Sequence, residues 1–114
     1  MARNMSFSLT TEQVLNRTKT VTRRFGWWFL KPGDELCAVE KAMGLKKGEQ
    51  IKRLAMIRVV SCRREPLNAI TQDDCIREGF PDDTPDTFVD MLQDHYSGSI
   101  APDVECNRIE FEYI

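Results

Sequence analysis

Strand-forming segments are unevenly distributed along these 114 residues, and this spacing constrains the fold more than any other feature. The two clearest strand patterns, residues 54–61 and 109–113, lie far apart in the chain, with short helical segments between them. A doubly wound parallel sheet needs strands and helices in regular alternation. The sequence therefore predicts an α+β domain with a small mixed β-barrel and about three short helices.

The three helices are predicted from the residues at their ends. Thr10, followed by Gln13, has the spacing of a capping box, and Thr71 marks a second helix start that Gly79 is placed to end. A third helix begins at Pro85, since proline is favoured at the first helical position. Its apolar residues recur at helical spacing, which indicates core packing; they are Phe88, Met91, Leu92 and Tyr96.

The length of the chain sets its domain organisation. A chain of 114 residues can close one hydrophobic core, but not two of ordinary size. We expect one domain over residues 6–114, preceded by an N-terminal extension at residues 1–5 that could be disordered. Residues 35–40 are predicted as a strand and residues 41–50 as an exposed hairpin loop.

The sequence contains no signal for a membrane or for export. A membrane-spanning helix needs about 18 apolar residues, and no run of that kind occurs. The N-terminus also lacks the apolar h-region of a secretory signal. These observations predict a cytoplasmic protein without a membrane partner, and they leave the oligomeric state open.

Positive and negative charges are segregated along the chain. Residues 1–64 contain 14 of the 16 Lys and Arg residues, whereas residues 65–114 contain 13 of the 18 Asp and Glu residues. Such segregation can create a basic face, which is typical of proteins that bind phosphate groups. Folding could equally interleave the two halves so that their charges pair.

The four cysteines form neither a metal-binding nor a disulfide pattern. They occur at positions 37, 62, 75 and 106, so no CxxC pair is present, and the single histidine, His95, is not close to any of them. Zinc sites need a closer ligand spacing, and disulfide frameworks are typical of exported proteins. We expect reduced thiols, no metal and no cofactor.

The densest cluster of candidate functional residues is segment 17–24, which contains four cations and three threonine hydroxyls. Arginine and lysine bind phosphates, and aromatic side chains that follow the segment could stack on an unpaired base. A charged edge strand followed by core tryptophans would have the same composition. On the binding interpretation, the nucleic-acid-binding residues are Arg17, Arg23, Arg24 and Trp27.

Glu78 and His95 are two further titratable candidates. Glu78 stands at a predicted helix end before a glycine, where a carboxylate could act as a general acid or base. A lone glutamate is more often solvated, however, and a lone histidine is more often a surface or packing residue. Glycine-rich phosphate loops and hydrolase motifs such as GxSxG are absent from the sequence.

Four short motifs occur in the order and spacing of a known family. They are Lys19-x-x-Thr22-x-Arg24, Lys31-Pro32-Gly33-Asp34 before a strand, Ile70-Thr71 before a helix that ends in Glu78-Gly79-Phe80, and the final Ile109-Glu110-Phe111. Together they make nearly the whole chain resemble the ASCH domain family of the PUA-like superfamily. The resemblance is to its small members that hydrolyse N4-acetylcytidine.

The resemblance implies a PUA-like β-barrel with a cleft beside the basic strand, and RNA or a modified nucleoside as the partner. A lysine, a threonine and a glutamate are catalytic in the small amidohydrolases, which places these roles on Lys19, Thr22 and Glu78. Arg24 matches the arginine that follows in the motif. Other members are described as ribonucleases, so cleavage of RNA is a second enzymatic possibility.

Two features complicate the transfer of these catalytic roles. Residues three apart in a regular strand point to opposite faces, so Lys19 and Thr22 need a bulge or a turn between them. Arg17 also stands where many members have a glycine, and a bulky residue there could alter the loop that presents Lys19. The chain further departs from the family in its Trp27-Trp28 pair and its longer charged loop.

The sequence thus leaves two main functional hypotheses. One is a domain that binds RNA or a modified nucleoside in a basic cleft and hydrolyses an acylated nucleoside such as N4-acetylcytidine. The alternative is a non-catalytic module that binds RNA or another nucleic acid. A protein-interaction role for the acidic C-terminal half has no motif in its favour.

Overall fold

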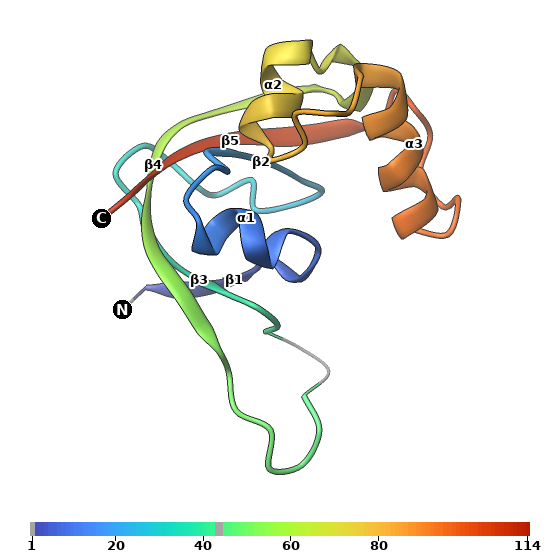
Figure 1. Cartoon of the computed structure of the whole chain (residues 1–114). Helices are drawn as coiled ribbons and strands as arrows, with labels where there is room; N and C mark the ends of the chain where they lie inside the picture. Colours follow the sequence, from blue (N-terminus) through green and yellow to red (C-terminus); the bar gives the residue numbers. More distant parts are fainter. Residues whose placement is uncertain (1, 43–44) are drawn as a thin grey trace.

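The computed structural model describes residues 2–42 and 45–114, which form a mixed five-stranded sheet with three α-helices. β1 runs parallel to β3, and the other neighbouring strands are antiparallel. The sheet curls into a half-barrel (Figure 1), which confirms the predicted α+β class and small mixed barrel. The strands, in spatial order, are β1 (Arg3–Ser6), β3 (Glu35–Val39), β4 (Arg53–Pro66), β5 (Glu105–Tyr113) and β2 (Val21–Arg24).

β4 is the strand that carries the curvature of the sheet. Its first part pairs with β3 and its later part with β5, and the register with β5 shifts between Val59 and Ser61. Such a shift bends a strand. β4 is longer than the predicted segment 54–61 because its pairing with β5 continues as far as Pro66 opposite Glu105, and local sequence carries no signal for a partner so distant.

The helices are α1 (Thr11–Leu15), α2 (Gln72–Arg77) and α3 (Pro85–His95). Thr71 caps α2 as predicted, and Thr84 forms a capping box at the start of α3. The predicted capping box at Thr10 is wrong, because the Thr10 side chain accepts no capping hydrogen bond. Thr10 ends a 3-10 turn (Ser8–Thr10), and its φ of −128° and ψ of 32° differ from the extended conformation that aims an N-cap side chain at the helix.

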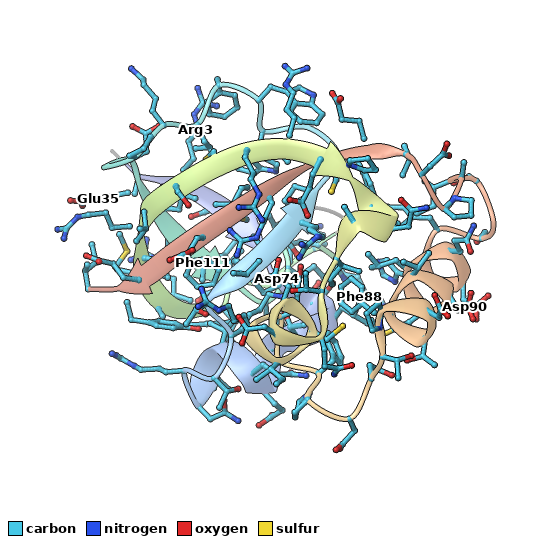
Figure 2. The ribbon with its side chains drawn as sticks, turned by 90° about the horizontal axis from the view of Figure 1, so that it is seen from above. Arg3, Glu35, Asp74, Phe88, Asp90 and Phe111 are labelled. Carbon is cyan, nitrogen blue, oxygen red and sulfur yellow. The ribbon has the colours of Figure 1, made fainter. Side chains whose placement is uncertain are left out.

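Two clusters of buried side chains hold these elements together. The larger lies inside the half-barrel and includes Phe7 and Phe111, whereas the smaller joins α2 and α3 to the 3-10 turn Leu67–Ala69. Figure 2 shows Phe111 among the strands and Phe88 on α3. Phe88 and Leu92 belong to the smaller cluster, so the predicted core role of the apolar stripe on α3 is confirmed for these two residues.

The N-terminal segment differs from its predicted role. β1 begins at Arg3 and pairs with β3, and Met5 is fully buried in the half-barrel. Residues 3–5 are therefore part of the sheet and not an extension in front of the domain. Their partner strand lies some thirty positions further along the chain, so the short polar segment gives no local sign of pairing.

The connection between β3 and β4 agrees with the predicted hairpin. The two strands are antiparallel and consecutive in the chain, and residues 46–50 are exposed. Residues 43–44 of the predicted loop lie outside the described residues. Within the described ranges, no helix is long and apolar enough to cross a membrane.

Candidate functional site

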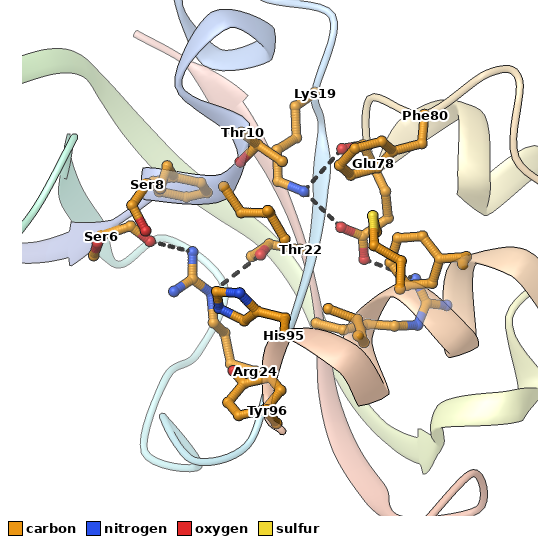
Figure 3. Close-up of a pocket in the computed structure, with 16 residues that line it drawn as sticks. Ser6, Ser8, Thr10, Lys19, Thr22, Arg24, Glu78, Phe80, His95 and Tyr96 are labelled. Carbon is orange, nitrogen blue, oxygen red and sulfur yellow. Dashed lines mark hydrogen bonds and ion pairs between the residues drawn. The ribbon is translucent and has the colours of Figure 1, made fainter. Parts of the chain in front are cut away.

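A cavity of about 220 Å³ lies between the N-terminal segment, β2, the end of α2 and the helix α3. It is lined by side chains from both core clusters as well as by charged and hydroxyl groups (Figure 3). All three predicted catalytic residues line it, together with the motif arginine: Lys19, Thr22, Glu78 and Arg24. The structure thus brings together residues that are up to 59 positions apart in the chain.

Lys19 reaches the cavity because it precedes β2 and is not part of it. The chain leaves α1 through Arg17, which has a φ of +62°, and β2 begins only at Val21. Tyr113 Oη donates a hydrogen bond of 2.5 Å to the Lys19 carbonyl and holds this turn. The strict alternation of a strand therefore does not apply between Lys19 and Thr22, which removes the predicted conflict over their faces.

Glu78 is held at the end of α2 by an unusual close approach of two segments. Gly79, with a φ of +98°, ends the helix, and its carbonyl accepts a hydrogen bond of 3.2 Å from Gln13 Nε2 in α1. A Cβ atom at Gly79 would lie 2.6 Å from Gln13 Cγ. The end of α2 is thereby fixed against α1, and this contact sets Glu78 beside the residues that follow α1.

Lys19 and Glu78 form a buried pair. Lys19 Nζ donates to Glu78 Oε1 at 2.5 Å and to the Glu78 carbonyl at 2.9 Å, and both residues are 3% exposed or less. Burial lowers the pKa of Lys19 from its ordinary value, and the neighbouring carboxylate of Glu78 opposes this shift only in part. Glu78 is therefore not a solvated surface glutamate, and Lys19 loses its proton more readily than an exposed lysine does.

Thr22 and Arg24 lie on the same side of β2 and contact each other. Arg24 Nε donates to Thr22 Oγ1 at 3.1 Å, and Arg24 Nη2 donates to the Ser6 carbonyl at 2.6 Å. The guanidinium also lies over the Phe7 ring, with 4.7 Å from Cζ to the ring centroid. These contacts connect the two edge strands of the half-barrel, β1 and β2, across the cavity.

Arg23 points away from Thr22 and into a network of carboxylates. Its guanidinium contacts Asp74 at 2.6 Å, Glu65 at 2.8 Å and Glu78 at 3.1 Å, and its side chain is fully buried. Arg108 also binds Asp74, at 2.7 Å, and the hydrogen bond from Arg108 holds the pKa of Asp74 well below its usual range. Here the basic and acidic halves of the chain pair with each other, as the interleaved arrangement requires.

The predicted nucleic-acid-binding residues are thus separated in the structure. Arg23 and Arg24 both line the cavity, but the guanidinium of Arg23 is already paired with three carboxylates. Arg17 is exposed and lies over the Tyr113 ring, outside the cavity lining. Trp27 packs against the half-barrel core and is half-buried.

Several cavity residues are not among the site residues predicted from the sequence. Ser6, Ser8 and Thr10 line the cavity from the N-terminal side, and His95 and Tyr96 line it from the end of α3. Tyr96 does belong to the helical stripe that predicts core packing, but it is 39% exposed. These residues meet only through tertiary packing, and no motif joins them in the sequence.

The cysteines and the acidic side chains offer no metal centre in the part of the chain that the structure describes. All four cysteines are free, and burial raises the pKa of the Cys106 thiol to about 11. No group of three His, Cys, Asp or Glu side chains among residues 2–42 and 45–114 is arranged to hold a metal ion.

Comparison with solved structures places this architecture among known folds. The ASCH domain from Lactobacillus crispatus JV V101 matches with a TM-score of 0.71 and 14% identity, over 97% of this chain and 78% of its own. The chain has the ASCH-domain fold. The resemblance inferred from the four motifs is therefore confirmed at the level of fold, including its PUA-like α+β architecture.

Two further solved structures share the ASCH-domain fold. Protein EF3133 from Enterococcus faecalis V583, assigned to DUF984, matches with a TM-score of 0.66 and 17% identity, over 99% of this chain and 79% of its own. Hypothetical protein PH0355 matches with a TM-score of 0.68 and 15% identity over the whole of both chains. No protein-family model and no curated protein matches the sequence.

Proposed function

We propose that the chain is a small hydrolase that removes the acyl group from an acylated nucleoside such as N4-acetylcytidine, through Lys19, Thr22 and Glu78. One observation carries this proposal: the buried Lys19–Glu78 pair and the Thr22 hydroxyl line one cavity. The resemblance to the ASCH amidohydrolases assigns catalysis to these three residues. Glu78 is far from Lys19 and Thr22 in the sequence, so their shared position in one cavity is additional support for the proposal.

The cavity suits a small planar ligand. Its volume of about 220 Å³ is below the range of roughly 300–1,000 Å³ that is usual for drug-sized ligands. Phe80 and Tyr96 provide aromatic surface for a base, whereas Lys19, Thr22 and Glu78 provide polar groups for an amide. A nucleobase with a small acyl substituent has this combination of properties.

The reaction can be written from these side chains. Neutral Lys19 takes the proton of the Thr22 hydroxyl, and Thr22 Oγ1 attacks the acyl carbonyl carbon. The carbon–nitrogen bond then breaks, the exocyclic nitrogen of the base receives a proton through Glu78, and the acyl group remains as an ester on Thr22. Water hydrolyses this ester, which releases the carboxylic acid and restores the threonine.

The proposal is tested by incubating the protein with N4-acetylcytidine and following cytidine release by chromatography. We expect turnover by the wild-type protein and none by Lys19→Ala. In that variant Glu78 keeps its contact with Arg23, so the fold should survive. Lys52→Ala is the matched control, because the Lys52 side chain is 65% exposed and lies outside the cavity. Absence of turnover by wild-type protein at high concentration would refute the proposal.

A second candidate function, a non-catalytic RNA-binding module, is favoured by an exposed aromatic surface. Trp28 is 42% exposed and Phe29 is 55% exposed. The Arg64 and Arg3 guanidiniums lie over these two rings, at 4.3 Å and 4.9 Å from the respective centroids. Aromatic and arginine side chains together form the stacking surfaces on which single-stranded nucleic acids bind.

The RNA-binding candidate is tested by titrating single-stranded RNA at low salt and following tryptophan fluorescence. If this function is correct, Trp28→Ala should weaken binding by about tenfold, since stacking on one base contributes roughly 1–3 kcal/mol. Ile76→Ala is the control, because Ile76 is similarly exposed, at 49%, and lies on α2. A lack of affinity at low salt would exclude this candidate.

A further inference from the structure

Arg24 brings a positive charge to the cavity without a carboxylate partner. No carboxylate of the described residues lies within 4.0 Å of its guanidinium nitrogens. Its two hydrogen bonds are to neutral acceptors, the Ser6 carbonyl and the Thr22 hydroxyl. Its remaining terminal nitrogen, Nη1, takes part in none of the hydrogen bonds within residues 2–42 and 45–114.

Three buried cations nearby differ from Arg24 in this respect. Lys19 is paired with Glu78, Arg23 with three carboxylates, and Arg108 with Asp74. A charge inside a protein is costly unless an opposite charge compensates it. Burial accordingly lowers the pKa of Arg24, and the more distant Glu78 and Tyr96 oppose that effect only in part. The Arg24 guanidinium is therefore able to bind an anion.

The position of Arg24 determines which anion it could bind. Its Nε lies 3.1 Å from Thr22 Oγ1, so a group bound to this guanidinium is next to the candidate nucleophile. Lys19 lines the same cavity, but its amine is paired with the Glu78 carboxylate. A guanidinium binds planar carboxylates through two parallel hydrogen bonds.

We propose that Arg24 forms a subsite for a small carboxylate anion beside Thr22. Its use in catalysis rests on the proposed function. When Thr22 Oγ1 bonds to the acyl carbon, the electron pair of the carbonyl bond moves to the acyl oxygen, and Arg24 donates a hydrogen bond to that oxygen. After hydrolysis the same guanidinium holds the carboxylate product.

The first test measures anion binding without catalysis, by titrating acetate into the protein and following amide and arginine side-chain NMR signals. We expect acetate to bind the wild-type protein and to bind Arg24→Gln at least about tenfold more weakly. Arg53→Gln is the control, because Arg53 is exposed and outside the cavity. Equal acetate affinity of the wild-type and Arg24→Gln proteins would overturn the proposal.

Arg24→Lys keeps the test decisive if Arg24→Gln does not fold. A lysine retains the charge but lacks the planar pair of donors. Arg24→Lys should therefore retain weak anion binding and lose the preference of the wild-type protein for acetate over chloride. An unchanged affinity together with an unchanged preference would contradict the proposed subsite.

The second test separates this subsite from the proposed function. With N4-acetylcytidine, Arg24→Lys should lower kcat by about 10²–10³-fold and change KM little. If Arg24→Lys keeps the wild-type kcat, the catalytic role of Arg24 is overturned, but the proposed hydrolase function is not. If acetate binding depends on Arg24 but the wild-type protein shows no turnover, the anion subsite is supported and the proposed hydrolase function is refuted.

Discussion

The ionisation of Lys19 is the residue-level property on which the proposed chemistry depends. Its amine lies in the protein interior and is hydrogen-bonded twice to Glu78, by the carboxylate and by the carbonyl. An ammonium group cannot accept a proton from Thr22. The fraction of Lys19 that is neutral therefore limits how much of the protein can react at a given pH.

The pH dependence of hydrolysis should report this ionisation. Burial lowers the pKa of Lys19 below the 10.5 of an ordinary lysine, so kcat/KM for N4-acetylcytidine should rise with pH and reach a plateau, with a midpoint below 10.5. The measurement is a pH–rate profile over the range in which the protein remains folded. A rate that does not change with pH, or that only falls as pH rises, would contradict a neutral lysine as the base.

At the level of elements, the site depends on the contact between the end of α2 and α1. Gly79 combines a φ of +98° with a position against Gln13. A side chain at this position would be unfavourable for two reasons: the positive φ strains the backbone, and the Cβ atom would clash with Gln13. The register of Glu78 against Lys19 follows from this contact, since Glu78 precedes Gly79 directly.

Gly79→Ala should therefore lower both stability and turnover. A positive φ costs a non-glycine residue about 1–2 kcal/mol, and overpacking against Gln13 adds about 1–3 kcal/mol. Gly33→Ala is the matched control, because Gly33 has a φ of +95° and a Cβ atom there would meet no neighbouring side chain or backbone within 4 Å. Urea titrations should show a larger decrease in the free energy of unfolding for Gly79→Ala than for Gly33→Ala. An equal decrease in the two variants would contradict a contribution from packing against Gln13.

The elements differ in how well the sequence predicts them. The caps at Thr71 and Thr84 are predictable because each depends on residues within four positions. The extent of β4 and the role of residues 3–5 are not, because both are set by pairing with distant strands. Motif order predicts Lys19, Thr22 and Glu78 as site residues. Ser8 and Thr10 from the N-terminal segment and His95 from α3 join them in the cavity lining only in the folded chain.

At the level of the whole molecule, charge segregation in the sequence becomes charge pairing in the fold. Arg23 from the basic half binds Glu65, Asp74 and Glu78 from the acidic half. Asp74 lies at the centre of this network, since it also binds Arg108 in β5. The pairing fixes α2 to β2 and β5, and it removes Arg23 from the charges that a nucleic acid could reach.

The stability of the whole chain should therefore depend on acid pH through Asp74. Arg108, together with Arg23, holds the pKa of Asp74 below its ordinary 3.8. A depressed pKa in the folded state contributes stability that is complete above 3.8 and is lost as pH falls towards the folded-state value. The free energy of unfolding from urea titrations should decrease between about pH 5 and pH 3.

Asp74→Asn tests the origin of this acid sensitivity. Removing one partner of a buried ion pair costs about 3–5 kcal/mol, so the variant should be less stable at neutral pH and less sensitive to acid than the wild-type protein. Asp90→Asn is the control, because Asp90 is an exposed residue on α3. If Asp74→Asn loses stability in acid as steeply as the wild-type protein, Asp74 is not the main source of the acid sensitivity.

The reaction of Thr22 with the acyl group, which we propose, is tested most directly by the nearly isosteric variant Thr22→Val. The measurement compares cytidine release from N4-acetylcytidine and affinity for cytidine between this variant and the wild-type protein, with Thr20→Val as the control outside the cavity. We expect cytidine release to fall by at least about 10³-fold and cytidine affinity to stay within about threefold. Undiminished cytidine release by Thr22→Val would exclude Thr22 as the nucleophile.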